Sequence, residues 1–455
     1  MDVSGGSRIK LSTAQIAGIT VGVVIFVVGI IILTLWLTGV LFSSSDDNSS
    51  LVSVSVTPSV VLLCPTNGVF GSVLSTITGT TTDFGAPLTV TIDGEYLAVT
   101  NTNGFTETGG NGSVYQKSGD SYTLIDTDTF TPPTDTRSAF NLISPLGTHV
   151  LTGITNVNFD TTEQEFYRLT TKSGTTFFNN AQVLQDTTYP LTFSPAFLSD
   201  DELVVSFRDS SFNSVVKLYR FENETWTLYQ TLTAPVGDGS SASFGASFTH
   251  AANVSILAIS QFTPPRVNIY TRASSTDNWT FQTAQTITAG ADAAALSWGS
   301  SIVMTEDGLT MAISDAGQNV GSNVQSGTVI IYRRDNVDDA FTLLQTINSQ
   351  SPSTNQFFGI DLTLFGTTMF ISINDQEETQ RQSEIYTLNA DTGTATFTQV
   401  IDWPHLISPA TALVTGASSA FYIDDTDLIL LAGYRNVTGE NGTITIQKSA
   451  CLLTT

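Results

Sequence analysis

An internal repeat runs through most of this 455-residue chain and constrains its fold more than any other feature. In its clearest form an aromatic-Gly pair is followed, at a fixed distance, by a polar turn and then by a short apolar run. Three copies keep this register without gaps, beginning at Phe84-Gly85, Phe244-Gly245 and Trp298-Gly299. Looser copies begin at Phe140, Phe193, Phe358 and Thr411. Units of about 50 to 60 residues indicate an array of small supersecondary units.

Each unit carries four short stretches in which apolar and polar residues alternate, which is the pattern of a half-buried β-strand. Residues 327–333 (GTVIIYR) illustrate the third stretch and residues 341–347 (FTLLQTI) the fourth. Four antiparallel strands per unit, repeated seven times, predict an all-β fold, a seven-bladed β-propeller. The seventh unit has no fourth stretch, whereas residues 73–78 (VLSTIT) match one and precede the first unit. We therefore expect the N-terminal strand 73–78 to close the last blade.

The two cysteines lie at the same junction between the ends of the chain. Cys64 precedes the expected closing strand, and Cys451 follows the last strand of the same blade. A disulfide between Cys64 and Cys451 would join the ends of the ring in an oxidising compartment, and two free buried thiols are the alternative.

A long apolar segment predicts the topology of the chain. Residues 16–42 contain no charged side chain, and a helix needs about 20 apolar residues to cross a bilayer. A cleaved signal peptide is the alternative, but its apolar region is usually about 7 to 15 residues long. Arg8 and Lys10 precede the segment, so we expect a cytoplasmic tail (1–15), a signal-anchor helix (16–42), a polar stalk (43–52) and an external propeller (53–455). Gly18 and Gly22 could let two such helices pack, which would give a homo-oligomer.

The charge balance excludes one class of partner. Lys and Arg total 16 against 41 Asp and Glu, a formal net charge of −25. Such a field repels phosphate backbones, so nucleic acid is an improbable partner. Seven Asn-x-Ser/Thr sequons agree with an external, glycosylated surface: Asn48, Asn111, Asn223, Asn253, Asn278, Asn436 and Asn441.

The repeated aromatic-Gly, Asp-Gly and GxVxxY pattern resembles the FG-GAP repeat family, which includes the propellers of integrin α-chains. The resemblance covers residues 70–450 and is strongest in the units that begin at Phe84 and Trp298. It implies a propeller and extracellular adhesion, and it also suggests calcium sites in the turns. Here the turns carry at most two adjacent carboxylates, as in Glu306-Asp307-Gly308, which is too few for calcium.

We therefore expect no metal and no cofactor at these turns, and interpret Asp-Gly as a type I′ hairpin link. The cluster Asp424-Asp425-Thr426-Asp427 is the one stretch dense enough to leave a metal site open.

Catalysis has little support in the sequence. Only His149, His250 and His405 could act as bases near neutral pH, and none belongs to a recognisable nucleophile or metal-ligand motif. We therefore expect no catalytic residues and interpret all three as structural.

Long polar loops between the second and third strands are the better candidates for function, because scaffold-borne loops usually carry binding sites. Asn101, Asp315 and Asp375 lie at the starts of three of them. The sequence thus predicts a membrane-anchored recognition or adhesion protein that binds an extracellular protein or glycan without catalysis. A structural coat component and an extracellular hydrolase on a propeller scaffold are the alternatives.

Overall fold

The computed structural model divides the chain into two units, Met1–Ser59 and Val60–Thr455. It describes residues 62–63, 73–78, 88–101, 111–131, 136–156, 165–189, 191–209, 213–235, 243–290, 293, 297–373, 382–402, 418–424, 427–434, 443–450 and 452–453. The predicted tail, signal-anchor and stalk lie outside these residues and stay predictions. Within the described ranges no helix is long and apolar enough to span a membrane.

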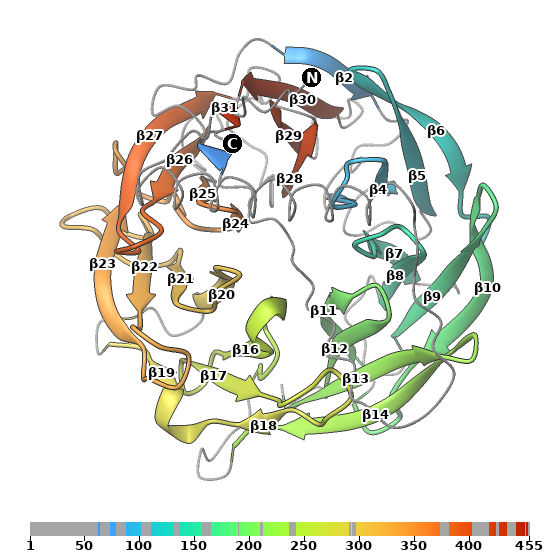
Figure 1. Cartoon of the computed structure of the whole chain (residues 1–455), viewed down its shortest axis with the longest axis horizontal. Helices are drawn as coiled ribbons and strands as arrows, with labels where there is room; N and C mark the ends of the chain where they lie inside the picture. Colours follow the sequence, from blue (N-terminus) through green and yellow to red (C-terminus); the bar gives the residue numbers. More distant parts are fainter. Residues whose placement is uncertain are drawn as a thin grey trace, which may run out of the picture. The chain divides into compact units, whose positions relative to one another are not determined.

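Within Val60–Thr455, six sheets are each built from strands that follow one another in the sequence, arranged as the blades of a β-propeller (Figure 1). The first sheet contains β3 (Leu88–Val90), β4 (Tyr96–Asn101), β5 (Asn111–Ser118) and β6 (Ser121–Thr127). The second contains β7 (Thr136–Ile143), β8 (His149–Asn156), β9 (Phe166–Ser173) and β10 (Thr176–Leu184). The third contains β11 (Leu191–Ser199), β12 (Glu202–Arg208), β13 (Ser214–Glu222) and β14 (Thr225–Thr233).

The fourth sheet contains β15 (Phe248–Ala251), β16 (Ile256–Gln261), β17 (Arg266–Thr271), β18 (Thr280–Phe281) and β19 (Ile287–Thr288). Two short 3₁₀ helices, η1 (Ala252–Val254) and η2 (Thr283–Gln285), interrupt it. The fifth contains β20 (Trp298–Met304), β21 (Thr310–Asp315), β22 (Thr328–Arg333) and β23 (Thr342–Asn348). The sixth contains β24 (Leu362–Phe365), β25 (Thr368–Ser372), β26 (Gln382–Leu388) and β27 (Ala395–Asp402).

A further four-stranded sheet takes strands from both ends of the chain. Its order is β2 (Val73–Thr78), β30 (Thr443–Ala450), β29 (Asp427–Tyr434) and β28 (Ser418–Asp424). The pairing of Thr78 with Thr443 and of Ile77 with Ile444 agrees with the expectation that the N-terminal strand completes this sheet. β28 contacts both β24 and β3, so the sheet lies between the sixth sheet and the first. The all-β propeller is confirmed, with six blades of consecutive strands and one sheet shared by the chain ends.

The aromatic-Gly pairs of the repeat join neighbouring blades. Phe244, Trp298 and Phe358 are fully buried. The glycines that follow them have left-handed backbone conformations, with φ of 77° at Gly299 and 87° at Gly359. A Cβ atom on Gly299 would lie 3.2 Å from Cβ of Ser260 in the preceding blade. The repeat therefore requires glycine both for backbone conformation and for close approach.

Buried hydroxyls at one position of the second strand form a matching pattern. Ser206, Ser260 and Ser314 are fully buried, and each hydroxyl accepts, at 2.8 Å, a backbone N–H from the innermost strand of its own blade or, for Ser260, from the residue directly before that strand. Ser206 Oγ also donates to the carbonyl of Gly245 in the next blade at 2.9 Å. Small polar residues at this position thus connect each inner strand to the strand beside it.

Gly299→Ala is expected to lower the free energy of unfolding by about 1 to 2 kcal/mol, because alanine is strained in the left-handed region and approaches Ser260. Gly290→Ala is the control, since no atom lies within 4 Å of a Cβ at that position and its φ is not positive. Denaturant midpoints of the two variants would test this, and equal midpoints would contradict the interlocking role of the motif.

Outer strands are joined by a polar side chain that recurs in the fourth stretch of the repeat. Gln230 Nε2 donates to the Trp279 carbonyl at 2.8 Å, and the Trp279 N–H donates back to Gln230 Oε1 at 2.8 Å. Gln182 makes the same pair of bonds with Trp226, and Gln345 with Ala395. Each of these glutamines binds the backbone of the following blade, which explains why the stretch keeps its amide.

The Asp-Gly turns are hairpins, but the type I′ interpretation is wrong. Gly308 N–H bonds the Thr305 carbonyl at 2.8 Å, Thr305 pairs with Thr310, and only Gly308 has a positive φ. The link is thus a four-residue loop. Asp307 Oδ1 accepts the Thr305 hydroxyl and the Leu309 N–H, so its carboxylate stabilises the turn.

Candidate functional site

Of the three predicted loop residues, the structure places one beside a cavity. Asp315 ends β21, is 1% exposed and lines a cleft of about 490 Å³. Asn101 ends β4, and only its backbone is described. Asp375 lies outside the described residues. The described residues therefore do not bring the three together, and Asp315 alone identifies a candidate binding cleft.

The cleft lies on the fifth blade, beside the connection that arrives from the fourth. Its lining residues are Gly290, Ala293, Asp315, Gln318, Asn319, Val320, Gly321, Thr328, Ile330, Tyr332, Leu343, Thr346 and Asn348. The fourth blade is the one whose outer strand is interrupted: β14 in the third blade has nine residues, whereas β18 and β19 have two each. The irregular segment around η2 is followed by the connection that contributes Gly290 and Ala293 to the lining.

Amides and a phenol give the cleft its hydrogen-bonding groups. The side chains of Gln318 and Asn348 make no hydrogen bond to any protein group in the described part of the chain, and neither does the Tyr332 hydroxyl. Burial raises the pKa of Tyr332, so the phenol stays neutral at physiological pH. Ile330 and the 62%-exposed Leu343 add apolar surface. Neutral polar groups around an apolar patch suit a small uncharged ligand.

Asp315 supports the loop that forms the other wall. Its Oδ1 accepts the Ser297 hydroxyl at 2.7 Å, and Ser297 Oγ in turn accepts the Gly317 N–H at 2.9 Å. The Gln318 N–H donates to the Asp315 carbonyl at 3.1 Å. Asp315 thus acts through the position of Gln318 and its neighbours.

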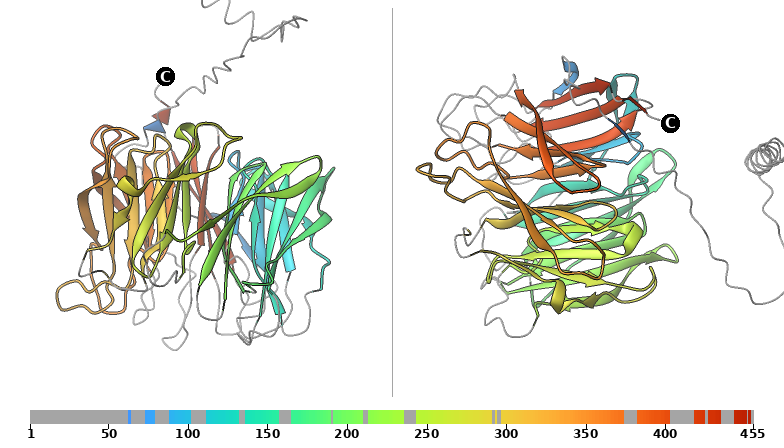
Figure 2. Two further views of the ribbon diagram at one scale, coloured as in Figure 1. Left: turned by 90° about the horizontal axis from the view of Figure 1, so that it is seen from below. Right: turned by 60° about the vertical axis from the view of Figure 1, so that its left-hand side comes forward.

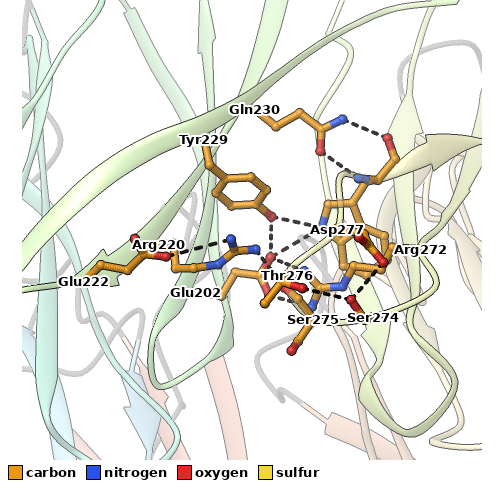
Figure 3. A network of polar contacts seen from close by, with 11 residues as sticks. Glu202, Arg220, Glu222, Tyr229, Gln230, Arg272, Ser274, Ser275, Thr276 and Asp277 are labelled. Carbon is orange, nitrogen blue, oxygen red and sulfur yellow. Dashed lines mark hydrogen bonds and ion pairs between the residues drawn. The ribbon is translucent and has the colours of Figure 1, made fainter. Parts of the chain in front are cut away.

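A polar network between the third and fourth blades is structural in character (Figure 3). Arg272 binds Glu202 with two bonds, Nη1 to Oε1 at 2.6 Å and Nη2 to Oε2 at 2.7 Å. Tyr229 and Trp279 also donate to Glu202, and the Arg272 guanidinium lies 4.2 Å from the Trp279 ring centre. Although burial opposes its ionisation, the bonds from Arg272 and Tyr229 hold the pKa of Glu202 below its usual value. Both carboxylate oxygens are bonded and the charge is paired with Arg272, so we assign the network to blade packing.

An acidic group near the centre of the ring has unusual electrostatics. Asp361 directly precedes β24, the innermost strand of its blade (Figure 1). Ser301 of the neighbouring inner strand donates to its Oδ1 at 3.5 Å and accepts the Leu362 N–H at 3.0 Å. Burial raises the pKa of Asp361 to about 6. No basic side chain forms an ion pair with it within the described ranges.

Asp361→Asn is expected to stabilise the fold above pH 6. Because the folded-state pKa of about 6 exceeds the usual 3.8, the stabilising contribution is complete below pH 3.8 and disappears as the pH rises through 6. Asparagine mimics the protonated acid, so the variant should be about 2 to 3 kcal/mol more stable than the parent at pH 7.5 and equal to it at pH 4. Unfolding curves at the two pH values would show this; a parallel offset at both would contradict it.

The other predicted residues are distributed over the surface and the blade interiors. Asn223, Asn253 and Asn278 are exposed and Asn111 is partly exposed, while Asn48, Asn436 and Asn441 lie outside the described residues. His250 is in the fourth blade, where burial lowers its pKa to about 4, so a structural role fits. His405 and the central residues of the Asp424–Asp427 cluster lie outside the described ranges.

Sequence reasoning missed the cleft lining and Asp361. Gln318 and Tyr332 lie in stretches that had been recognised, but no motif marks residues contributed by strands and loops of different blades. The sequence signal for the cleft is the irregular spacing in WTFQTAQTI, residues 279–287, which departs from the fourth stretch of the other units.

No protein-family model matches this chain. No curated protein sequence matches it either. The FG-GAP resemblance therefore stays an expectation.

Solved structures with a similar arrangement include a periplasmic gluconolactonase of Pseudomonas aeruginosa, with 13% identity and a TM-score of 0.47 over 69% of this chain and 84% of that one. A putative 6-phosphogluconolactonase of Bacteroides fragilis has 12% identity and a TM-score of 0.48, covering 69% and 83%. Sqt1 of Saccharomyces cerevisiae has 10% identity and a TM-score of 0.46, covering 83% and 99%. At these identities and TM-scores the likeness transfers no substrate or activity to this chain.

These structures correct one step of the sequence interpretation. The sequence predicted an adhesion protein that is not an enzyme, because the chain carries a propeller pattern and no catalytic motif. The similar propellers include proteins named as lactonases, so that pattern gives no ground for excluding catalysis. The interpretation as a non-catalytic adhesion protein is therefore withdrawn.

Proposed function

We propose that this propeller binds a small, uncharged, polyhydroxylated molecule in the cleft of the fifth blade. The observation that carries the proposal is a set of neutral groups around the cleft that have no hydrogen-bond partner among the described residues: the amides of Gln318 and Asn348 and the hydroxyl of Tyr332. Amides offer both donors and acceptors, which match the hydroxyl groups of a sugar or sugar derivative. The volume of about 490 Å³ falls within the range of small-molecule sites, about 300 to 1,000 Å³.

Charge supports an uncharged ligand. The chain has a formal net charge of −25, and among the described residues that line the cleft Asp315 is the one acidic side chain. No Lys or Arg is among its described lining residues, so a phosphate or carboxylate would lose its hydration without gaining a cationic partner there. A neutral ligand avoids that penalty.

Binding can be measured by saturation-transfer NMR and calorimetry with a panel of neutral mono- and disaccharides. Asn348→Ala and Gln318→Ala should each weaken the binding of a responding sugar about three- to tenfold, as expected for one lost hydrogen bond. Asn179→Ala is a matched control, because it removes a partly exposed amide from β10 of the second blade. Absence of binding to the whole panel, or equal affinity in all three variants, would exclude the proposal.

Hydrolysis at the centre of the ring is a second candidate function, favoured by Asp361. A carboxyl group with a pKa near 6 can both give and take a proton near neutral pH, as a general acid or base requires. Its ionisation opposes folding at neutral pH, and residues that a fold retains at such a cost are often functional.

Chromogenic esters, glycosides and lactones are suitable probes for this second candidate. Turnover should rise or fall around pH 6 and be lost in Asp361→Asn. Asp307→Asn is the control, because the Asp307 carboxylate accepts its hydrogen bonds within the hairpin turn between β20 and β21. Turnover that survives in Asp361→Asn would remove Asp361 from any mechanism.

A further inference from the structure

His149, Asp200 and Asp201 meet where the second and third blades adjoin. His149 is the first residue of β8, and Asp200 and Asp201 form the link between β11 and β12. One ligand atom from each residue, a ring nitrogen or a carboxylate oxygen, lies within 4.8 Å of the other two. His149 lies about 50 positions from the two aspartates in the sequence, so only the assembled propeller brings the three residues together.

The Asp200 carboxylate is already held in place by the second blade. Its Oδ1 accepts the Leu146 N–H at 2.9 Å, and its Oδ2 accepts the Thr148 hydroxyl. Each oxygen has a second lone pair, so both remain able to bind a cation. The turn before β8 therefore orients Asp200 toward the side of His149.

Asp201 supplies a second carboxylate, which has no cationic partner among the described residues. Its backbone carbonyl accepts the Phe221 N–H at 2.9 Å, but its carboxylate accepts no hydrogen bond from the described residues. Neither aspartate forms an ion pair with Lys or Arg in the described part of the chain. Two adjacent carboxylates beside one another create a local field that favours a cation.

The next acidic residue in the sequence, Glu202, has its charge compensated by an arginine. It faces Arg272 of the fourth blade and is neutralised there by two bonds (Figure 3). The run Asp200-Asp201-Glu202 thus divides between two blade interfaces. The Glu202 side has a guanidinium, whereas the side with the two aspartates has an imidazole.

The His149 ring is buried and held by three contacts. It is 1% exposed and packs edge-to-face on Phe221 and Trp226, with ring centres 4.4 and 5.0 Å away. Its Nδ1 lies 3.2 Å from the Thr171 hydroxyl. Burial lowers the pKa of His149, so the ring is neutral at physiological pH. A second-shell bond to one ring nitrogen that orients the other is characteristic of metal-ligating histidines.

We propose that His149, Asp200 and Asp201 form a binding site for a divalent transition metal, with Zn²⁺ as the preferred ion and water in the remaining position. Zn²⁺ accepts both imidazole nitrogens and carboxylate oxygens, and open zinc sites have three protein ligands with water in the fourth position. Ligands at about 2 Å from zinc are about 3.3 Å apart, whereas these ligand atoms lie within 4.8 Å of one another, so binding requires the side chains, above all the exposed Asp201, to move closer. Ca²⁺ is disfavoured because it requires six to eight oxygen ligands.

The test uses the full chain, freed of metal with a chelator and titrated with Zn²⁺ by calorimetry. One equivalent should bind, and Asp201→Asn should weaken the affinity at least tenfold; this side chain is exposed, so the variant is expected to fold. His149→Gln should have a similar effect. Asp338→Asn is the matched control, since Asp338-Asp339 is another exposed pair of aspartates that lies near Arg334 instead of a histidine.

Co²⁺ absorption gives a second measurement, which would not depend on His149 if that residue only packed in the core. Co²⁺ bound to the three residues should produce visible absorption bands that shift when His149 is replaced. The proposal fails if no equivalent of Zn²⁺ binds, if Asp201→Asn and Asp338→Asn have equal affinities, or if Ca²⁺ competes equally with Zn²⁺.

Discussion

Arg272→Met is expected to lower the free energy of unfolding by about 3 to 5 kcal/mol, because it leaves the Glu202 carboxylate buried without its cation. The side chains of Arg272 and Glu202 are 8% and 6% exposed, so water cannot replace the lost partner. The guanidinium also packs on the Trp279 ring, and methionine keeps part of that apolar contact. Denaturant midpoints measured at pH 7 would give the difference.

The double variant Arg272→Met with Glu202→Gln separates charge from packing. It should recover much of the lost stability, since no uncompensated charge remains. The nearby pair Arg220–Glu222 provides the control: its atoms are 3.9 Å apart and Glu222 is 57% exposed, so Glu222→Gln should change stability by less than about 1 kcal/mol. A loss of similar size in Arg272→Met and Glu222→Gln would show that burial does not determine the strength of these pairs.

The repeat made most of the fold predictable because its signature residues perform local tasks. The aromatic at Trp298 fills the core, Gly299 permits a left-handed backbone close to the preceding blade, and the hydroxyl of Ser314 bonds the inner strand. Each task constrains residue type at one position, so each leaves a mark in the sequence. The glutamine of the fourth stretch does the same for the outer strands, as Gln230 shows.

The sites were less predictable because they depend on contacts between units. His149 and Asp200 come from consecutive blades, and neither occupies a conspicuous position in its own repeat. Asp361 occupies the repeat position that Ser301 has in the preceding unit. The sequence does not show that these two side chains contact each other across neighbouring inner strands. The cleft likewise lies beside the fourth blade, whose outer strand departs from the repeat. The repeat pattern therefore does not predict it.

The Asp-Gly motif predicted the hairpin but not its turn type. Asp-Gly marked a hairpin, as expected, but the loop contains four residues, and its aspartate bonds the turn itself. The motif resembled a calcium loop because both uses place a carboxylate before a glycine. The two hydrogen bonds that Asp307 accepts account for an aspartate at this position without a bound ion.

Reduction of the chain is expected to lower its stability by about 4 to 5 kcal/mol if Cys64 and Cys451 are joined, the entropic contribution of closing a loop this long. Both cysteines lie outside the described residues, but their neighbours do not. β1 (Leu62–Leu63) pairs antiparallel with β31 (Leu452–Leu453), with Leu62 opposite Leu453 and Leu63 opposite Leu452. Cys64 follows Leu63 and Cys451 precedes Leu452, so continuation of this register by one residue would set them opposite each other.

Intact mass with and without reductant, after alkylation, gives the first measurement, and unfolding curves of the oxidised and reduced chain give the second. Cys451→Ser should reproduce the reduced midpoint and make it insensitive to reductant, whereas a second substitution at Cys64 should add little. Alkylation of both thiols in the unreduced, denatured chain would show that the ends of the ring are held by strand pairing alone. In that case β2 and β1 would carry the closure, and the midpoint should be the same with and without reductant.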